Sequence, residues 1–489
     1  MTISIPKFDQ INPQQWIVWA FAGVVLLSVF GALATDQYAL FGLPVVFLLL
    51  FVSVVDIKKI YWLLLFCIPL SVEVPISSSL ATDLPTEPLM VLFLIVGLIF
   101  LITHVHKLGK GFLLHPLTLI LLLHIGWTFA CTIVSDLFVV SLKYSLAKLW
   151  YLVSFFFLAR FFLKAEKDWK TFLWIILIPL SLATLITVVR HSFFGFSFDK
   201  ANSVTWPFFR NHVTYAATLV LFLPFAVLGR QWYPKGHILR KVLWLLVGVL
   251  LVGIFFSYTR AAYISIFIAV GAYFVIRFKL TRLAVILSIG VASVMGLKMV
   301  QDNAYMHYAP EFKKTVTHYE FDNLVAATAK GEDISTMERV YRWVAGVFVI
   351  KAHPWMGVGP GNFYNFYQRY SLNAFSTYVS DNPDRSGIHN YYLLMGVEQG
   401  IPGMIFFLIL IVGVLDYGER IYHQSSSRAV KNFVMAILLC FIIILALLLI
   451  NDMIETDKVG SFFFLCIALL VNIDLHNRKV LSPKNQMEG

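Results

Sequence analysis

The stretch KNFVMAILLCFIIILALLLI, residues 431–450, carries one charge at its first position and no polar side chain after Asn432. A helix needs about 20 consecutive apolar residues to cross the hydrocarbon core of a bilayer. Similar stretches recur along the chain, for example WIVWAFAGVVLLSVFGALA at residues 16–34. Of the 489 residues, 59% are hydrophobic and 13% are charged, which is about half the charged fraction of a soluble domain. The sequence therefore predicts an all-α, polytopic integral membrane protein.

We expect about 12–14 transmembrane helices, about 11 of them within residues 1–300. The candidate segments are 16–34, 38–55, 60–75, 88–103, 116–134, 144–163, 171–190, 212–229, 240–257, 261–277, 282–300, 390–415, 430–450 and 459–474. A large loop is expected at 301–388, the last transmembrane helices at 389–474 and a tail at 475–489. Within the loop, STMERVYRWVAGVFVIKA (335–352) has the spacing of an amphipathic helix.

The net charge of +11 favours a membrane orientation rather than nucleic-acid binding, because Lys and Arg lie in short loops and form no basic domain. Alternate loops are basic, such as GRQWYPKGHILRK (229–241) and the tail HNRKVLSPK (476–484). The loops between them are acidic or neutral, such as NDMIETDK (451–458). Basic loops face the cytoplasm, so both termini are expected there and the large loop on the outer side. The first apolar run could end a signal peptide at ALA (32–34), but its length and weakly basic leader favour an uncleaved helix.

Arg210 and Arg260 stand at the predicted outer ends of helices. This position is unusual because Lys and Arg are most frequent on the cytoplasmic side. Arg260 lies between two apolar segments with almost no loop, at a depth where an unpaired charge is costly. A guanidinium can bond two phosphate oxygens at once. Both arginines therefore predict an anionic partner, either a protein carboxylate or a lipid phosphate, whereas snorkelling at a helix end is the structural alternative.

His389 and Asn390 precede an apolar segment, at the same outer boundary. In the structural interpretation, Asn390 caps the helix and His389 is part of a solvated loop. In the functional one, the two arginines above and the loop residues Arg339 and Arg342 surround the imidazole. Positive neighbours favour the neutral imidazole, which can accept a proton from an alcohol as a general base.

Five further residues are predicted to have structural roles. Gly400 and Gly403 lie one turn apart and would let helices approach closely, and Glu398, inside the same apolar segment, needs a hydrogen-bond or cationic partner. Gly357 and Gly359 belong to GVGPGNF (357–363), which predicts a turn because the strand–turn–helix context of a phosphate-binding loop is missing.

The sequence predicts neither a metal site nor a cofactor. It has no Asp-x-Asp, no zinc-ligand spacing and no GxxxxGK[ST]. Its four cysteines lie in apolar segments, which indicates small buried side chains. The carboxylates Glu73, Asp83 and Glu87 of one outer segment leave a divalent cation as an alternative.

The motif HNYYLLMGVEQGIPG (389–403) resembles the signature His-[Asn/Ser/Gln]-x9-Gly-x-x-Gly of the bacterial O-antigen ligase and O-antigen polymerase superfamily. Three further segments resemble that superfamily in the same order: FFRNHVTYAATLVL (208–221), SYTRAAYISI (257–266) and ERVYRWVAGVFVIKAHPWMGVGPGNF (338–363). The resemblance covers roughly residues 205–415. It implies a multi-pass protein of the bacterial inner membrane whose large loop and active site face the periplasm.

The resemblance also implies a metal-independent, inverting glycosyltransferase that takes a glycan from undecaprenyl diphosphate. Ligases use the lipid A–core oligosaccharide as acceptor, polymerases another carrier-linked unit, and related enzymes a protein hydroxyl. His389 would be the general base and Arg210 and Arg260 would stabilise the leaving diphosphate; the expected substrate-binding residues are Arg339, Arg342, Asn390 and His212. We take the ligase as the first hypothesis and the polymerase as the second. A flippase or exporter of the same lipid-linked glycan, which would need outer cations but no base, is the alternative from another class.

Overall fold

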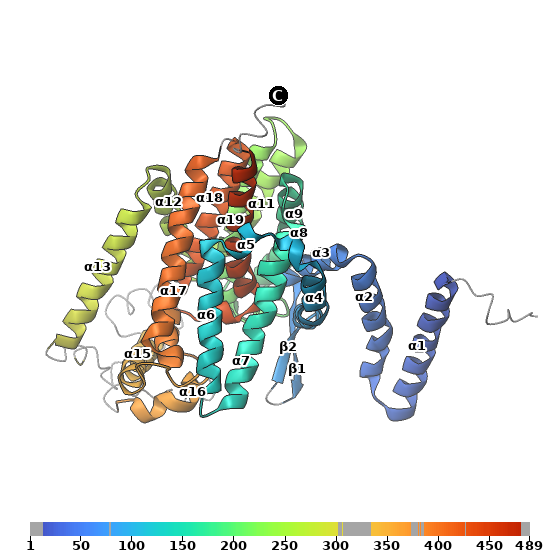
Figure 1. Cartoon of the computed structure of the whole chain (residues 1–489), viewed down its shortest axis with the longest axis horizontal. Coiled ribbons are helices and arrows are strands. Elements are labelled where there is room, and N and C mark those ends of the chain that lie inside the picture. Colours follow the sequence, from blue (N-terminus) through green and yellow to red (C-terminus); the bar gives the residue numbers. More distant parts are fainter. Residues whose placement is uncertain are drawn as a thin grey trace, which may run out of the picture. The chain divides into compact units, whose positions relative to one another are not determined.

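The structure is a computed structural model that describes residues 13–77, 80–301, 306, 334–372, 380, 382, 386–425 and 427–480. Much of the expected large loop, including 307–333, lies outside the described residues. The chain forms two compact units, Met1–Leu65 and Phe66–Gly489. The first contains α1 (Pro13–Thr35), the short η2 (Tyr38–Gly42) and α2 (Leu43–Val55), and α3 (Ile57–Cys67) begins in it (Figure 1). Ser28 Oγ of α1 donates to Leu40 O of η2 at 2.7 Å, which fixes the turn between the two helices.

The second unit is built from helices and one β-hairpin. Its elements are η3 (Ile68–Leu70), β1 (Val72–Ser77), β2 (Leu80–Leu84), α4 (Thr86–Leu108), α5 (Lys110–Leu113), α6 (Pro116–Ile133), α7 (Phe138–Tyr151), the π-helical η4 (Leu152–Phe157), α8 (Leu158–Phe162), α9 (Glu166–Ser192), η5 (Phe198–Lys200), η6 (Ser203–Thr205), α10 (His212–Gly229), η7 (Arg230–Trp232), α11 (Ile238–Phe255), α12 (Arg260–Arg277), α13 (Thr281–Val300), α15 (Ile334–Ala352), α16 (Phe363–Phe366), η9 (Tyr367–Tyr370), α17 (Tyr391–Gln424), α18 (Arg428–Leu447), η11 (Met453–Glu455) and α19 (Asp457–Val480).

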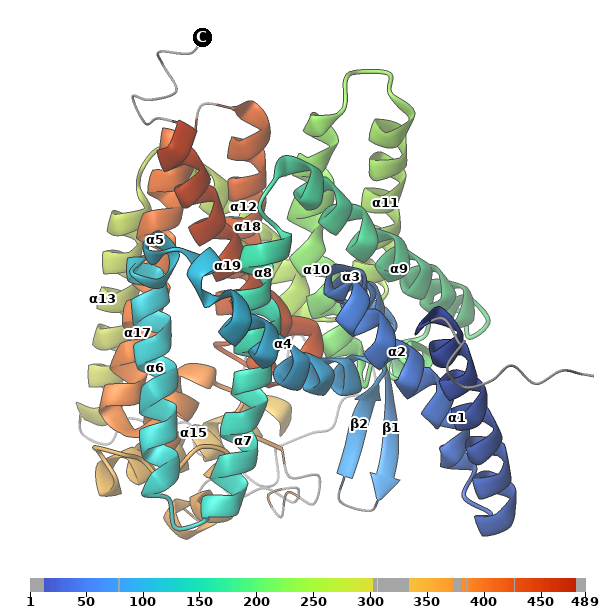
Figure 2. The same ribbon diagram turned by 45° about the vertical axis from the view of Figure 1, so that its right-hand side comes forward.

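Twelve helices of the described residues are long and apolar enough to cross a membrane. This confirms the prediction of an all-α, polytopic membrane protein. The amphipathic helix expected in the large loop is present as α15. Within the second unit, α18 packs against α10, α12, α17 and α19. Of the twelve helices α19 is the most enclosed, followed equally by α10 and α18. By contrast, α13 stands at the edge and is almost entirely exposed (Figures 1 and 2).

Two predicted transmembrane segments differ from the structure. The segment 60–75 is wrong as a continuous helix, because α3 ends at Cys67, Pro69 lies in the following 3-10 turn and Val72 begins β1. The strand β1 pairs antiparallel with β2, Val72 opposite Leu84, and this hairpin was not predicted. The segment 38–55 is shorter than expected: α2 has 13 residues and so rises about 20 Å, less than the hydrocarbon thickness.

The helices of the second unit define two ends. At one end α10, α17 and α19 begin, and α15 packs against α17 there; we call it the loop end. Its segments are joined by the bond from Tyr391 N to Leu448 O at 2.9 Å and by the Lys458 ammonium over the Phe209 ring at 5.4 Å. At the opposite end, the tail end, α17 and α19 finish. Figures 1 and 2 show α15 and the hairpin at one end and the last turns of α19 at the other.

Candidate active site

His389 precedes α17 at the loop end and its backbone is fixed on both sides. Trp343 Nε1 donates to Ile388 O at 3.0 Å, and Tyr391 N donates to Leu448 O at 2.9 Å. The φ of His389 is +55°, a left-handed conformation that is uncommon for a residue other than glycine. Asn390 caps α17 by accepting from Leu393 N at 3.0 Å. The structure therefore gives Asn390 the capping role and holds His389 in a defined position beside α15.

The His389 imidazole lies among two arginines and an aspartate. Its Nδ1 is 4.0 Å from Asp452 Oδ1, and its side chain is 28% exposed. Burial, followed by the charges of Arg339 and Arg342, lowers the pKa of His389 to about 4, and an interaction with the Asn451 side chain opposes this shift. Burial has the larger effect on the pKa of His389. The sequence had indicated only the effect of the neighbouring positive charges. The imidazole is therefore neutral near pH 7.

The Nδ1 atom of His389 is buried and has no hydrogen-bond partner among the residues that the structure describes. The side chain as a whole is 28% exposed, so an external hydroxyl can reach the ring on its exposed side, away from Nδ1. We call His389, Arg339, Arg342, Asn451 and Asp452 the His389 cluster. A neutral and partly accessible imidazole of this kind can accept a proton.

The arginines of the His389 cluster come from successive turns of α15. Arg342 is buried and bonds Gly387 O at 3.2 Å and Glu338 Oε2 at 3.2 Å. Ser380 Oγ donates to the other oxygen of Glu338 at 2.8 Å. Glu338 thus offsets part of the positive charge of Arg342. Arg342 therefore has a structural role in holding the segment before His389, as well as an electrostatic effect on the imidazole.

The connection between α18 and α19, which carries Asn451 and Asp452, is tied to α7 and α17. Lys148 Nζ bonds Tyr391 Oη at 2.9 Å and Glu455 Oε1 at 2.5 Å. Tyr144 Oη donates to the same carboxylate oxygen at 2.6 Å. A buried lysine requires such a partner because an unpaired charge in the interior is strongly destabilising. These contacts place the connection beside the start of α17.

Sequence reasoning missed Asn451, Asp452 and Glu455. The only signal was the acidic character of the segment NDMIETDK (451–458), which helped to predict orientation. Burial raises the pKa of Asp452, while Arg342 and Arg339 lower it. Asp452 therefore shares both arginines with His389.

Arg210, His212 and Arg260 form a second group at the loop end. His212 Nδ1 is 2.7 Å from Ser257 O; since a carbonyl only accepts, Nδ1 carries the proton. Thr259 Oγ1, next to Arg260, is 3.3 Å from His212 O. The Arg210 side chain is 73% exposed and its Nε lies 3.9 Å from Glu73 Oε2. The structure thus brings His212 to the segment that carries Arg260, and it gives Arg210 a carboxylate partner.

The sequence-predicted site residues therefore fall into two sets at one end of the bundle. His389, Arg339 and Arg342 meet in the His389 cluster. The contacts of Arg210 and His212 are with the hairpin and with the start of α12. Phe209, which precedes Arg210, lies below the ammonium of Lys458 at the start of α19.

Glu398 binds backbone amides rather than an arginine. Its carboxylate accepts from Phe363 N at 3.1 Å, and its own carbonyl accepts from Gly359 N at 3.0 Å. Gly357 and Gly359 have φ values of +64° and +93° and lie in a turn, as predicted. Glu398 therefore fastens the loop that follows α15 to α17.

Gly400 interrupts α17, with φ 69° and ψ −178°. The Ile401 N–H donates to Pro354 O at 2.8 Å, and a Cβ at Gly400 would overlap the Trp355 carbonyl. The sequence predicted that Gly400 lets a neighbouring helix approach. In the structure, Gly400 is instead a break in α17, and the loop of Pro354 and Trp355 fills it. Gly403 does adjoin another helix, since a Cβ there would lie 3.2 Å from Trp127 Cδ1 of α6.

Glu73, Asp83 and Glu87, the three carboxylates considered as ligands of a divalent cation, interact with other residues of the protein. Thr82 Oγ1 donates to Glu87 Oε2 at 2.6 Å, Glu73 faces Arg210, and burial followed by the charge of Asp457 raises the pKa of Asp83 to about 7. Among the described residues, no group of three or more His, Cys, Asp or Glu side chains could hold a metal ion.

The fold and the His389 cluster define a polytopic α-helical membrane protein with a neutral histidine beside arginines at one end of its bundle. Residues 242–408 match the family model described as O-antigen ligase. This match confirms the predicted resemblance to the O-antigen ligase and polymerase superfamily, whose members are glycosyltransferase-like enzymes. The matched region includes the His389 signature and Arg260 but ends short of Arg210 and His212 on its N-terminal side. No curated protein matches the chain.

Proposed function

We propose that the protein is an O-antigen ligase-type glycosyltransferase. It moves a glycan from undecaprenyl diphosphate to a hydroxyl group of the lipid A–core oligosaccharide, at the periplasmic face of the inner membrane. The observation that carries this proposal is the partly accessible His389 imidazole, whose pKa is lowered to about 4 beside Arg339 and Arg342. The O-antigen ligase match over residues 242–408 supports the same type of reaction.

In the proposed reaction the acceptor oxygen attacks the anomeric carbon while its proton passes to His389. The bond from the anomeric carbon to the diphosphate oxygen breaks, and the electron pair leaves with the polyprenyl diphosphate. Attack from the opposite side inverts the anomeric configuration. Arg210 and Arg260 stabilise the negative charge that grows on the leaving group. These cations supply the charge neutralisation that a divalent ion gives in other glycosyltransferases, so no metal or cofactor is required.

Asp452 favours this proton transfer. When His389 accepts the proton it becomes a cation, 4.0 Å from the Asp452 carboxylate. The carboxylate, which is 27% exposed, then offsets part of the imidazolium charge as well as part of the charge of the two arginines. This is the role that an aspartate has beside the histidine of a catalytic triad, where it stabilises the imidazolium ion.

The polymerase is the closest alternative, because it performs the same chemistry on a carrier-linked acceptor. A deletion strain distinguishes the two: full-length carrier-linked polymer accumulates without a ligase, and single repeat units accumulate without a polymerase. A flippase or exporter would transport the donor without needing a base at His389.

Purified protein with defined donor and acceptor lipids tests the proposal. His389→Ala should retain donor binding and lose about 100- to 10,000-fold in turnover, the usual contribution of a general base. His106→Ala, which removes an exposed histidine of α4, serves as the control and should keep full activity. Wild-type turnover in excess chelator should be unchanged. A folded His389→Ala protein with normal turnover would contradict the assignment of the base.

A further inference from the structure

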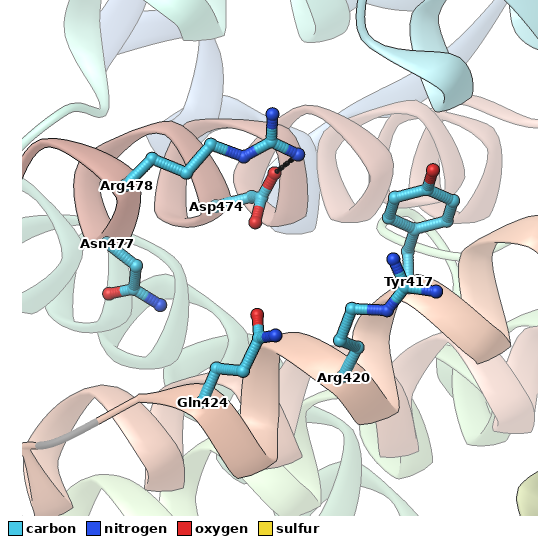
Figure 3. Close-up of a pocket in the computed structure, with 6 residues that line it drawn as sticks. All are labelled: Tyr417, Arg420, Gln424, Asp474, Asn477 and Arg478. Atoms are coloured by element: carbon cyan, nitrogen blue, oxygen red, sulfur yellow. Dashed lines mark ion pairs between the residues drawn. The ribbon is translucent and has the colours of Figure 1, made fainter. Parts of the chain in front are cut away.

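The last turns of α17 and α19 enclose a pocket of about 470 Å³ at the tail end, the opposite end from the His389 cluster. Figure 3 shows side chains from the two helices lining it from both sides. The lining residues are Tyr417, Arg420 and Gln424 of α17, and Asp474, Asn477 and Arg478 of α19. The proposed transfer reaction uses none of them.

The negative charge in this pocket is already neutralised. Arg478 Nη2 lies 2.6 Å from Asp474 Oδ2, the ion pair drawn in Figure 3. His115 Nε2 is 3.1 Å from the same oxygen. Leu117 N donates to His115 Nδ1 at 3.2 Å, so the proton of this imidazole is on Nε2 and the ring is neutral. Asp474 therefore balances only the charge of Arg478.

Arg420 shares its carboxylate partner with another arginine. Its Nη2 lies 3.4 Å from Asp416 Oδ2, while Asp416 Oδ1 lies 2.5 Å from Arg282 Nε. Glu419, next to Arg420 in the chain, also acts on Arg282, so three carboxylates offset the three guanidinium groups. The Arg420 and Arg478 side chains are nevertheless 46% and 60% exposed, and each guanidinium has further N–H groups that can bond a ligand.

Arginines near the end of a helix can simply stabilise the helix C-terminus. That role would not require the side-chain amides of Gln424 and Asn477, which line the same pocket and add neutral N–H donors. Asn477 uses one donor toward Ser425 Oγ, at 3.0 Å. A planar guanidinium bonds two oxygens of a phosphate at once, and the pocket volume is in the range of small-ligand sites.

We propose that this pocket binds the phosphate group of an anionic ligand. Arg420 and Arg478 approach the phosphate from opposite helices, and the two amides donate to its remaining oxygens. The pocket lies at the ends of two transmembrane helices, at the level where phospholipid headgroups are found. An anionic phospholipid headgroup and free phosphate share this chemistry, and the experiment separates them.

The protein, purified in zwitterionic detergent, is mixed with dioleoylphosphatidylglycerol, dioleoylphosphatidylcholine or inorganic phosphate. Native mass spectrometry measures the bound lipid, and thermal unfolding measures the shift of the midpoint. We expect retention of phosphatidylglycerol in preference to phosphatidylcholine. Arg420→Gln keeps the Arg478–Asp474 pair, and should lower phosphatidylglycerol occupancy about tenfold, the effect of losing one charge-assisted contact. Lys235→Gln, an exposed cation of the same end outside the pocket, is the control and should bind as the wild type does.

Stabilisation by inorganic phosphate that Arg420→Gln abolishes, without selective lipid binding, would assign the pocket to a free phosphate. Equal retention of both lipids together with no effect of phosphate overturns the proposal. So does a loss of phosphatidylglycerol in Lys235→Gln as large as in Arg420→Gln, because the attraction would then be a general property of the basic surface. Thermal unfolding without added ligand verifies that each variant is folded.

Discussion

His389 is the residue at which burial and charge act in the same direction. Burial disfavours the imidazolium ion because the charged form loses hydration, and Arg339 and Arg342 disfavour it by repulsion. A histidine with its ordinary pKa near 6.5 would be partly protonated near neutral pH. The lowered pKa of His389 keeps the base in its active form over the whole physiological range.

The acidic limb of the kcat/KM profile should therefore lie near pH 4, because kcat/KM reports the free enzyme. The pKa is lowered, so the base stays unprotonated as the pH falls from 7 and is lost only around this value. Arg339→Gln removes one repelling cation and should move the limb upward by about one pH unit. Arg369→Gln, an exposed arginine of η9, is the control. An unshifted limb in Arg339→Gln would show that another group is titrating.

Asp452→Asn tests the carboxylate that faces the base. The amide has nearly the same shape but cannot offset the charge of His389 after proton transfer, so kcat should fall about 10- to 100-fold, with little change in KM. Steady-state kinetics of the wild type and the variant near neutral pH measure kcat and KM separately. A change in KM alone would indicate that Asp452 only supports substrate binding.

Among the elements, α17 combines a rigid start with a break. Asn390 caps its first turn, and Gly400 opens the helix so that the loop after α15 can enter. The Ile401 N–H, which would bond within a continuous helix, pairs with Pro354 O instead. The break therefore fastens α17 to the same loop segment that follows the two arginines of the His389 cluster.

Gly400→Ala should destabilise the protein by about 2–4 kcal/mol, because φ 69° with ψ −178° suits glycine and the added Cβ overlaps the Trp355 carbonyl. Gly126→Ala in α6, where the added Cβ has open space, is the matched control and should be neutral or slightly stabilising. Thermal unfolding in detergent compares the two variants. Equal stabilities would mean that α17 can form a continuous helix through residue 400.

The sequence predicted the elements whose information is local. Long apolar runs predicted the transmembrane helices, and Asn390 before such a run indicated a cap. The hairpin was missed because Val72 and Val74 extend the apolar run of α3 on either side of Glu73, and only Pro69 and the pairing with β2 reveal a strand. The break at Gly400 was read as a helix contact, since the sequence does not show which segment approaches a glycine.

The sequence predicted part of the grouping of residues around His389, and the rest was missed because it depends on contacts between distant segments. Arg339 and Arg342 lie close to His389 because α15 packs against α17. Side chains of α15 also bond the residues directly before His389. Asp452 reaches His389 only after α17 and α18 have run through the bundle and returned. Such a contact depends on how helices pack, and no local pattern encodes it.

For the whole molecule, the distribution of charge predicts which end faces which compartment. The turn of Lys235 and the last turn of α19 are basic and lie at the tail end, whereas the His389 cluster and the acidic connection after α18 lie at the loop end. If basic loops are cytoplasmic, the loop end faces the periplasm, where the proposed acceptor is located.

Two exposed lysines make this orientation testable. Lys200 lies in η5 at the loop end and Lys235 between α10 and α11 at the tail end. Each is replaced by cysteine in a Cys67→Ser background, since the other three native cysteines are buried. A membrane-impermeant maleimide added to spheroplasts should label Lys200→Cys and not Lys235→Cys, and inverted membrane vesicles should give the reverse pattern. Labelling of Lys235→Cys in spheroplasts would place the His389 cluster in the cytoplasm. Its base could then act only on a donor that has not crossed the membrane, and the ligase proposal would fail even if His389 were essential.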